Sequence, residues 1–138
     1  MGGAYPAAIL YRLVSRRGAV AIRILVALED DYRVYRETIA AGIRILRPRA
    51  ETKSVELKAL EVEIERFEPQ VVIYSGPTTV DTGGSLTWVK LSLDPTSSTK
   101  ISVRGYCLER TNPTLAELLE LIDQVEEANI TGSIDLPA

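Results

Sequence analysis

The fold of this chain is decided by the run Arg23-Ile24-Leu25-Val26-Ala27-Leu28, which stops at the acidic residues Glu29-Asp30-Asp31. From Ala19 to Leu28 the chain is apolar except for Arg23, and it is rich in valine and isoleucine. A short segment of this kind is typical of a strand that is buried on both faces, as in a parallel sheet. We therefore predict a strand over residues 19–28, with three carboxylates at its carboxyl end.

A helix is predicted immediately after the acids. The carboxylate of Asp30 or Asp31 can cap this helix, because it can accept hydrogen bonds from the free amides of the first turn. Pro48 then ends the helix, because proline cannot continue the hydrogen-bond ladder. Four apolar residues at helical spacing predict the face that packs on the core: Tyr35, Ile39, Ile43 and Leu46.

The alternation of strand and helix continues along the first half of the chain. A short strand is predicted over 51–55 and a helix over 57–67, where apolar residues recur at the helical period. Residues 60–64 also alternate like a strand, but the flanking apolar residues favour the helix. Pro69 ends this helix, and a third strand follows over 70–74. The β-α-β-α-β order is typical of a parallel sheet with right-handed crossovers.

The pattern changes in the second half of the chain. Residues 75–84 are rich in threonine and glycine and predict a loop. Strands are predicted over 86–93 and 100–108. The few residues between them cannot form a parallel crossover, so we expect an antiparallel hairpin. A final helix is predicted after Pro113, with leucines at helical spacing toward the core.

These elements predict a three-layer α/β domain. Its central sheet is mostly parallel and is followed by an antiparallel β-hairpin and a C-terminal helix. A chain of 138 residues suits one domain with one core. We expect the domain over residues 19–128, after an N-terminal extension of uncertain order, 1–18, and before a loose tail, 129–138.

The composition excludes several kinds of site. The chain has no histidine and a single cysteine, Cys107. Ser-His-Asp and Cys-His catalysis, histidine-ligated zinc and an intrachain disulfide are therefore excluded. Cys107 and Trp88 are interpreted as packing residues. No apolar run reaches the roughly 18 residues of a membrane span, and the chain begins without a basic leader, so we expect a cytoplasmic protein with no membrane partner.

The charges are divided unevenly along the chain. A net charge of −3 gives no general attraction to nucleic acid. Residues 1–50 hold nine arginines and four acids, whereas residues 51–138 hold seven basic residues and fifteen acids. We expect the arginines of the first helix to face the acids of the last helix, with an acidic partner or phosphates as the alternative. Those arginines are Arg33, Arg36, Arg44 and Arg47.

Several segments resemble parts of a response-regulator receiver domain. Arg23-Ile24-Leu25-Val26 followed by acids, with Val34-Tyr35-Arg36-Glu37 in the next helix, is similar to a receiver's first strand and helix. Phe67-Glu68-Pro69-Gln70-Val71-Val72-Ile73-Tyr74-Ser75 is similar to the segment that leads to the phosphorylated aspartate, and Glu117-Leu118-Leu119 resembles the last helix. The resemblance implies a receiver-like, flavodoxin-like fold and a role in signalling.

The sequence departs from the receiver pattern at three points. Ser75 stands where the phosphoacceptor aspartate would be, and a serine cannot form an acyl phosphate. The receiver's lysine after the last strand is not evident, and Arg110 is the nearest cation. The hairpin also leaves no room for the fourth receiver helix. We therefore do not expect phosphorylation by the mechanism of that family.

The acid pocket is nevertheless the best candidate for a ligand site, because doubly wound sheets bind ligands beyond the carboxyl ends of their strands. Carboxylates there can hold Mg²⁺ through oxygen ligands and waters. A serine and a glycine after the third strand can offer a hydroxyl and amides to an anion. The alternative is a capping acid, two solvated acids and a plain connecting loop. The candidate ligand-binding residues are Glu29, Asp30, Asp31, Ser75, Gly76 and Arg110.

Three functional hypotheses follow. The first is a non-catalytic regulatory or protein-interaction module, with a homodimer or another protein as partner and the hairpin edge as its surface. The second is a protein that binds a small ligand, a nucleotide or Mg²⁺ between the two strand ends, Mg²⁺ being the one cofactor considered. The third, a metal-assisted hydrolase, needs a further acid such as Asp81 or Asp94. A nucleophilic Ser75 would need Lys90 or Lys100 as its base, and nothing in the sequence places either lysine there.

Overall fold

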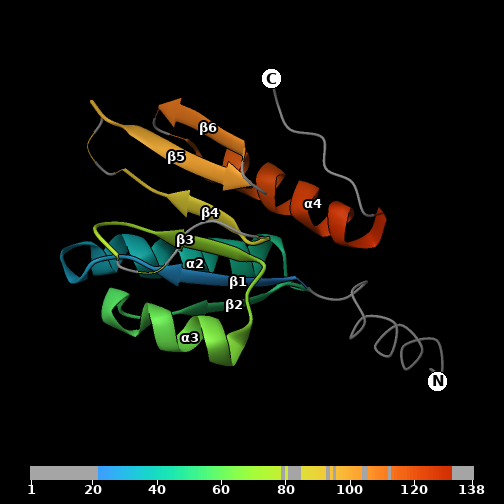
Figure 1. The fold of residues 1–138 in the computed structure, drawn as a ribbon, viewed down its shortest axis with the longest axis horizontal. Coiled ribbons are helices and arrows are strands. Elements are labelled where there is room, and N and C mark those ends of the chain that lie inside the picture. The colour runs from blue at the N-terminus through green and yellow to red at the C-terminus, as the bar shows by residue number, and fades with distance from the viewer. Residues whose placement is uncertain are drawn as a thin grey trace.

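The computed structural model of the chain is a six-stranded sheet with helices on both faces (Figure 1). The predicted extension, 1–18, lies outside the residues that the structure describes, as do residues 132–138 of the predicted tail. The described residues are 22–78, 80, 85–92, 94, 96–103, 106–111 and 113–131.

The strand order in the sheet is β2-β1-β3-β4-β5-β6, and the α/β class predicted from the sequence is confirmed. The first four strands run parallel, whereas β5 runs antiparallel to both of its neighbours. The carboxyl ends of β1, β3, β4 and β6 therefore meet at one edge of the sheet. The strands are β1 (Arg23–Ala27), β2 (Glu51–Ser54), β3 (Val71–Tyr74), β4 (Thr87–Lys90), β5 (Ser98–Val103) and β6 (Tyr106–Thr111).

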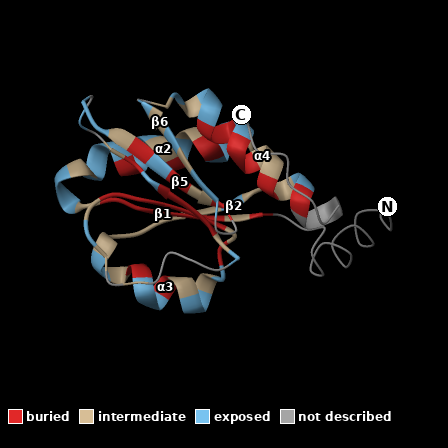
Figure 2. Ribbon diagram, turned by 45° about the horizontal axis from the view of Figure 1, so that its top comes forward, coloured by how far each residue is buried: buried red, intermediate tan, exposed pale blue. Residues whose placement is uncertain are grey.

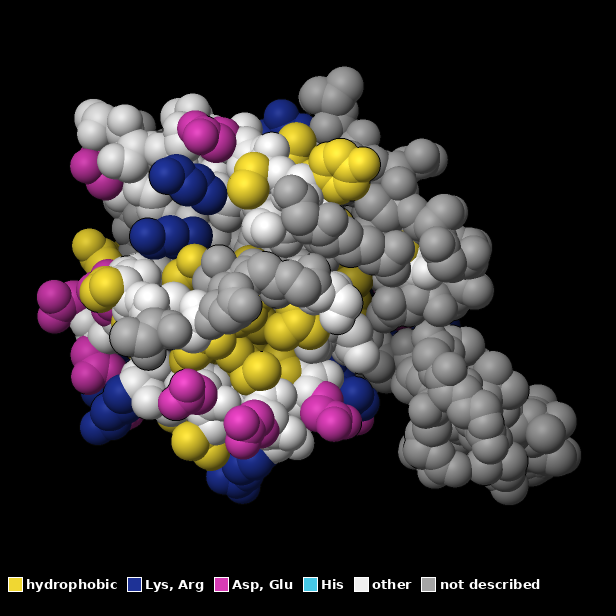
Figure 3. Space-filling view, in the orientation of Figure 1, with side chains coloured by type: hydrophobic (Ala, Val, Ile, Leu, Met, Phe, Trp, Pro, Cys, Tyr) yellow, Lys and Arg dark blue, Asp and Glu magenta, His cyan; other side chains and the backbone are white. Residues whose placement is uncertain are grey.

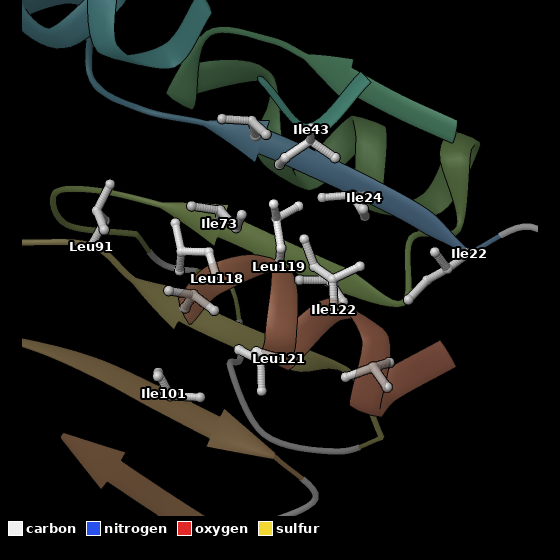
Figure 4. Close-up of a cluster of buried hydrophobic side chains, with 14 of the residues drawn as sticks. Ile22, Ile24, Ile43, Ile73, Leu91, Ile101, Leu118, Leu119, Leu121 and Ile122 are labelled. Carbon is white, nitrogen blue, oxygen red and sulfur yellow. The ribbon is translucent and has the colours of Figure 1, made fainter. Parts of the chain in front are cut away.

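Two helices cover one face of the sheet and one helix covers part of the other (Figure 1). α2 and α4 share a large core with apolar residues of five strands, which Figure 4 shows in close-up. α3 packs on a smaller cluster that Trp88 and Tyr74 extend. The helices are α2 (Arg33–Leu46) after the 3₁₀ turn Asp30–Tyr32, α3 (Leu60–Phe67) after the 3₁₀ turn Leu57–Ala59, and α4 (Leu115–Thr131).

The uninterrupted apolar run of the sequence is explained by this layering. From Ile24 to Leu28 every side chain is fully buried, because successive residues of β1 point to opposite faces and both faces are covered. The four residues of β3 are buried in the same way. Figure 2 shows the buried residues along the centre of the sheet.

The predicted apolar stripe of α2 is partly wrong. Ile43 is buried, but Tyr35 and Leu46 are largely exposed. The buried stripe instead contains Arg36, Ala40 and Ile43, so it is rotated by about one residue from the prediction. The guanidinium of Arg36 reaches the carbonyl of Leu28 at 3.5 Å, and this polar contact allows a charged residue at a buried helical position.

The predicted capping role of Asp30 and Asp31 is also wrong. Both residues lie within the 3₁₀ turn that precedes α2, so neither occupies the position before the helix. Tyr32 occupies that position, and no side chain bonds to the first amides of α2. The local reason is that the chain makes a tighter turn before it enters the helix, which satisfies the Tyr32 amide through the Glu29 carbonyl.

The predicted hairpin pairs as expected, since β4 and β5 are antiparallel with Lys90 opposite Lys100. The predicted single strand over 100–108 is wrong, because it divides into β5 and β6. The signal that could have revealed this division is Gly105, a residue type favoured in turns. None of the described residues between β3 and β4 is helical, although these two strands are parallel neighbours.

The sequence predicted that four arginines of the first helix face the acids of the last helix. One of them, Arg47, does so at the seam between α2 and α4. Arg47 donates to both carboxylate oxygens of Asp123, at 2.7 Å each, and this bond raises the pKa of the arginine. Arg44 instead donates to the carbonyl of Thr52, and Arg36 points inward. The seam is tight, because a β-carbon on Gly42 would lie 2.7 Å from a methyl of Leu115.

Candidate functional site

The two strand ends singled out in the sequence lie side by side. β1 and β3 are parallel neighbours, with Ala27 opposite Tyr74, so Glu29 and Ser75 leave the sheet together. The backbone N–H of Glu29 donates to Oγ of Ser75 at 2.9 Å. Ser75 is only 3 % exposed, so its hydroxyl is a buried acceptor that ties the two strand ends together.

Gly76 has a structural role at the same point. Its φ of 82° lies in the left-handed region, which glycine adopts without steric cost. A β-carbon added there would clash with Cδ of Glu29, so the glutamate side chain lies directly over the glycine. Gly76 therefore permits both the turn after β3 and the close approach of Glu29.

The three acids do not converge on one point. Asp30 and Asp31 are exposed, and Glu29 is half-buried. The carboxylate of Asp30 lies 3.9 Å from the guanidinium of Arg36. Within the described parts of the chain, no group of three His, Cys, Asp or Glu side chains is arranged to hold a metal ion.

Glu29 borders two separate hollows in the surface. One, of about 610 Å³, lies beside the start of α3 and also contacts Asp30. The other, of about 330 Å³, lies beyond the carboxyl ends of the strands, and we call it the strand-end hollow. Six residues that matter for its chemistry line this hollow: Glu29, Ser75, Gly76, Lys90, Asp94 and Lys100.

The sequence named Lys90 and Lys100 only as possible bases for Ser75 and did not place either near it, whereas the structure brings both to the hollow that Ser75 lines. Lys90 is the last residue of β4 and Lys100 lies directly opposite it on β5. The sequence predicted their two strands and the pairing between them, but it did not show that β4 lies parallel to β3. That parallel pairing brings Lys90 to the same edge of the sheet as Ser75.

Arg110 is not one of the described residues that line the strand-end hollow. It lies on β6, opposite Thr99, and β6 is the third strand from β3. With neighbouring strands roughly 4.8 Å apart, that separation is on the order of 14 Å. The cations nearest to Ser75 along this edge are therefore the lysines of β4 and β5.

Asp94 lines the hollow but is engaged in its own turn. Its carboxylate accepts hydrogen bonds from the amide of Thr96 at 2.9 Å and from the hydroxyl of Thr96 at 2.8 Å. These bonds, the amide first, lower the pKa of Asp94. Asp81, the other acid considered for a hydrolase, lies outside the described residues.

The two residues interpreted as packing residues differ. Trp88 is 2 % exposed and stacks edge-on against Tyr74, with ring centroids 5.8 Å apart. Burial raises the pKa of that tyrosine. The packing interpretation is wrong for Cys107, which is exposed on β6 because none of the described helices covers its face of the sheet.

No protein-family model matches this chain, and no curated protein and no solved structure matches it significantly. Among the described helices, none combines the length and the apolar character that crossing a membrane requires.

Proposed function

We propose that the protein is a cytoplasmic, non-catalytic regulatory or protein-interaction module with a degenerate receiver-like fold, and that residue 75 is not phosphorylated. The observation that carries this proposal is the hydrogen bond from the Glu29 amide to the Ser75 hydroxyl. This bond engages a buried oxygen at the position where a receiver would present its carboxylate. Signalling through this fold would then depend on binding a protein.

The surroundings of Ser75 support the same proposal. Phosphoryl transfer to a receiver-like site needs oxygen ligands that gather around Mg²⁺. Here Asp30 and Asp31 are exposed, and Asp30 lies near Arg36. Among the described residues these acids form no group of three that could hold a metal ion, which supports the proposal.

Incubation with a small phosphodonor and Mg²⁺, followed by intact-mass measurement, tests this proposal. We expect no adduct on the natural protein. We also expect none on Ser75→Asp, because a new carboxylate does not bring the other acids together. A stable phosphoryl adduct on the natural protein would overturn the proposal, and an adduct on S75D alone would show that the acid pocket still functions.

The partner surface that we propose is the outer edge of β6. β6 is the last strand of the sheet, so among the described residues nothing pairs with its outer backbone groups. An unpaired strand edge is a template for a further strand. Tyr106, at the start of β6, is 67 % exposed and adds apolar area next to this edge.

A second copy of the chain is the partner that the charges of β6 favour. Consider two copies of β6 that pair antiparallel about a two-fold axis. If the axis passes at Glu109 or at Arg110, that residue lies opposite the same residue of the other copy, so two like charges face each other. An axis at Leu108 avoids both clashes. It places Arg110 opposite the partner's Tyr106, and Cys107 opposite the partner's Glu109.

Introducing either a negative or a positive charge at Cys107 tests this dimer. Light scattering should give a dimer mass for the natural protein at high concentration. Cys107→Glu should weaken the dimer, because it meets the partner's Glu109 twice, whereas Cys107→Lys should strengthen it. Cys107→Ser is the matched control, since the side chain is exposed. A monomer at all concentrations, or equal effects of both charged variants, would contradict the proposal.

A second candidate function is the binding of a small ligand in the strand-end hollow. It is favoured by the position of the hollow beyond the carboxyl ends of parallel strands and by the two lysines in its wall. A thermal-shift panel of Mg²⁺, nucleotides and anions tests it, because a ligand that binds the folded state raises the melting temperature. A panel without any shift would contradict it.

A further inference from the structure

We infer that the strand-end hollow is an oxyanion site for a small phosphate ester that also carries hydroxyl groups, such as a phosphorylated sugar. Lys90 and Lys100 would hold the phosphate, and Glu29 would accept from a hydroxyl of the same molecule. This inference rests on the second candidate function and is independent of the first.

The two lysines lie directly opposite each other on neighbouring strands. Residues directly opposite on antiparallel strands have β-carbons about 5 Å apart, and like charges at such positions repel each other. Lys90 and Lys100 occupy one such pair and are both exposed. Neither forms an ion pair with a described residue, and Glu109, which flanks Lys100 on β6, is not within ion-pair distance. A bound dianion would relieve this repulsion.

The face on which the lysines lie gives the second argument. α3 covers β1 and β3 but does not extend over β5 and β6. Figure 3 views this uncovered face and shows Lys and Arg side chains gathered over the ends of β4 and β5. The lysines are therefore accessible to a ligand from solvent while they are anchored on two paired strands.

The two acids in the wall of the hollow have different roles. Both oxygens of Asp94 accept hydrogen bonds within its turn, so this charge is already compensated locally. Glu29 lies over Gly76 and borders the hollow with a carboxylate that can accept further hydrogen bonds. Two ammonium groups beside one such carboxylate match a phosphate joined to a hydroxyl donor better than they match a bare polyphosphate.

The volume of the hollow limits the size of the ligand that it can hold. Ligand cavities span roughly 300–1,000 Å³, so a hollow of about 330 Å³ belongs at the small end of that range. A sugar phosphate fits such a space, whereas a dinucleotide would extend beyond it. Hydroxyls of Ser92 and Ser98 in the same wall add neutral hydrogen-bonding groups for a polyol.

Calorimetric titration of the full chain with ribose 5-phosphate, inorganic phosphate and unphosphorylated ribose tests this inference at low, constant ionic strength. We expect ribose 5-phosphate to bind more tightly than phosphate, and ribose not to bind. Lys90→Ala and Lys100→Ala should each weaken binding about tenfold, the usual effect of one charge-assisted contact. Glu29→Gln should reduce the preference for the ester over phosphate.

Lys58→Ala is the matched control, because Lys58 is 81 % exposed and borders the other hollow. It should leave binding unchanged, and the unliganded lysine variants should be as stable as the natural protein. Equal weakening by K58A and K90A, or stabilisation of every variant by sulfate alone, would show general ionic attraction and overturn the inference. Binding of a phosphate-free ligand that ignores both lysines would overturn it too, while leaving the second candidate function intact.

Discussion

The two halves of the sheet differ in whether helices cover both of their faces or one. β1 and β3 are buried on both faces, between α2 and α4 on one side and α3 on the other. Among the described helices, only α4 covers β5 and β6 (Figure 1). The other face of these two strands exposes Lys100, Cys107 and Glu109. A strand covered on both faces has to be apolar throughout. A strand with one free face can present charged side chains, and there the protein can meet a ligand or a partner.

The strand-end hollow lies at the border between these halves. Its Ser75 and Gly76 follow β3, whereas its lysines belong to β4 and β5. β3 supplies buried backbone to the hollow, whereas β5 and the exposed last residue of β4 supply the two lysines. This division explains why the candidate site needs residues from both halves.

The largest expected difference between the halves concerns core truncation. Leu25→Ala should lower the free energy of unfolding by about 2–5 kcal/mol, because it leaves a cavity at a fully buried position between β1 and α3. Ser102→Ala, on the open face of β5, should change it by no more than about 0.5 kcal/mol. Chemical denaturation of both variants measures the difference. Similar losses would show that the open face is covered in solution.

The next effect concerns the bond between the strand ends. Ser75→Ala should cost about 1–3 kcal/mol of unfolding free energy, because the Glu29 amide loses its acceptor in a partly buried position. Ser98→Ala, in the wall of the same hollow, is the control and should be nearly neutral. A neutral S75A would mean that water replaces the hydroxyl, and the strand ends would then be less firmly joined than we infer.

The difference between the halves also decides what the sequence could predict. The doubly covered strands were predicted correctly, because burial on both faces leaves an unbroken apolar run such as 24–28. β6 was not separated from β5 in the prediction, because its sequence, three apolar residues followed by three polar ones, has neither an unbroken apolar run nor a regular alternation. The buried Arg36 was missed for another reason, since its acceptor, the Leu28 carbonyl, is a backbone group that no side-chain pattern reveals.

Only some residues of the candidate site could be located from the sequence. The sequence located Glu29 and Ser75 at strand ends on the same edge of the sheet, because the predicted first and third strands run parallel. It could not locate Lys90 and Lys100, because their place depends on how β4 joins β3. That choice between a parallel and an antiparallel neighbour is made by tertiary packing, and the intervening loop carries no helix pattern that would indicate a parallel crossover.

A smaller difference in stability is expected between alanine substitutions at two glycines. Gly76→Ala should cost about 1–2 kcal/mol, because alanine is strained at a φ of 82° and Glu29 has to move. Gly42→Ala, inside α2, should change stability by less than about 1 kcal/mol, because the gain in helix propensity offsets a contact with the movable Leu115 methyl. Thermal unfolding should therefore separate the two variants. An equal loss would show that the α2–α4 seam cannot adjust.

The smallest expected effect concerns the ion pair that joins α2 and α4 across this seam. Arg47 belongs to the end of α2 and Asp123 to α4, and both side chains are partly exposed, at 36 % and 45 %. Such a pair contributes about 0–1 kcal/mol, and salt screens it. A double-mutant cycle of Arg47→Met and Asp123→Asn should therefore give a coupling energy in that range that falls as salt is added. Arg44→Met is the control, because Arg44 bonds to the Thr52 carbonyl and not to α4. A coupling energy well above this range that is insensitive to salt would mean that the pair, rather than the apolar core beneath it, holds α2 and α4 together.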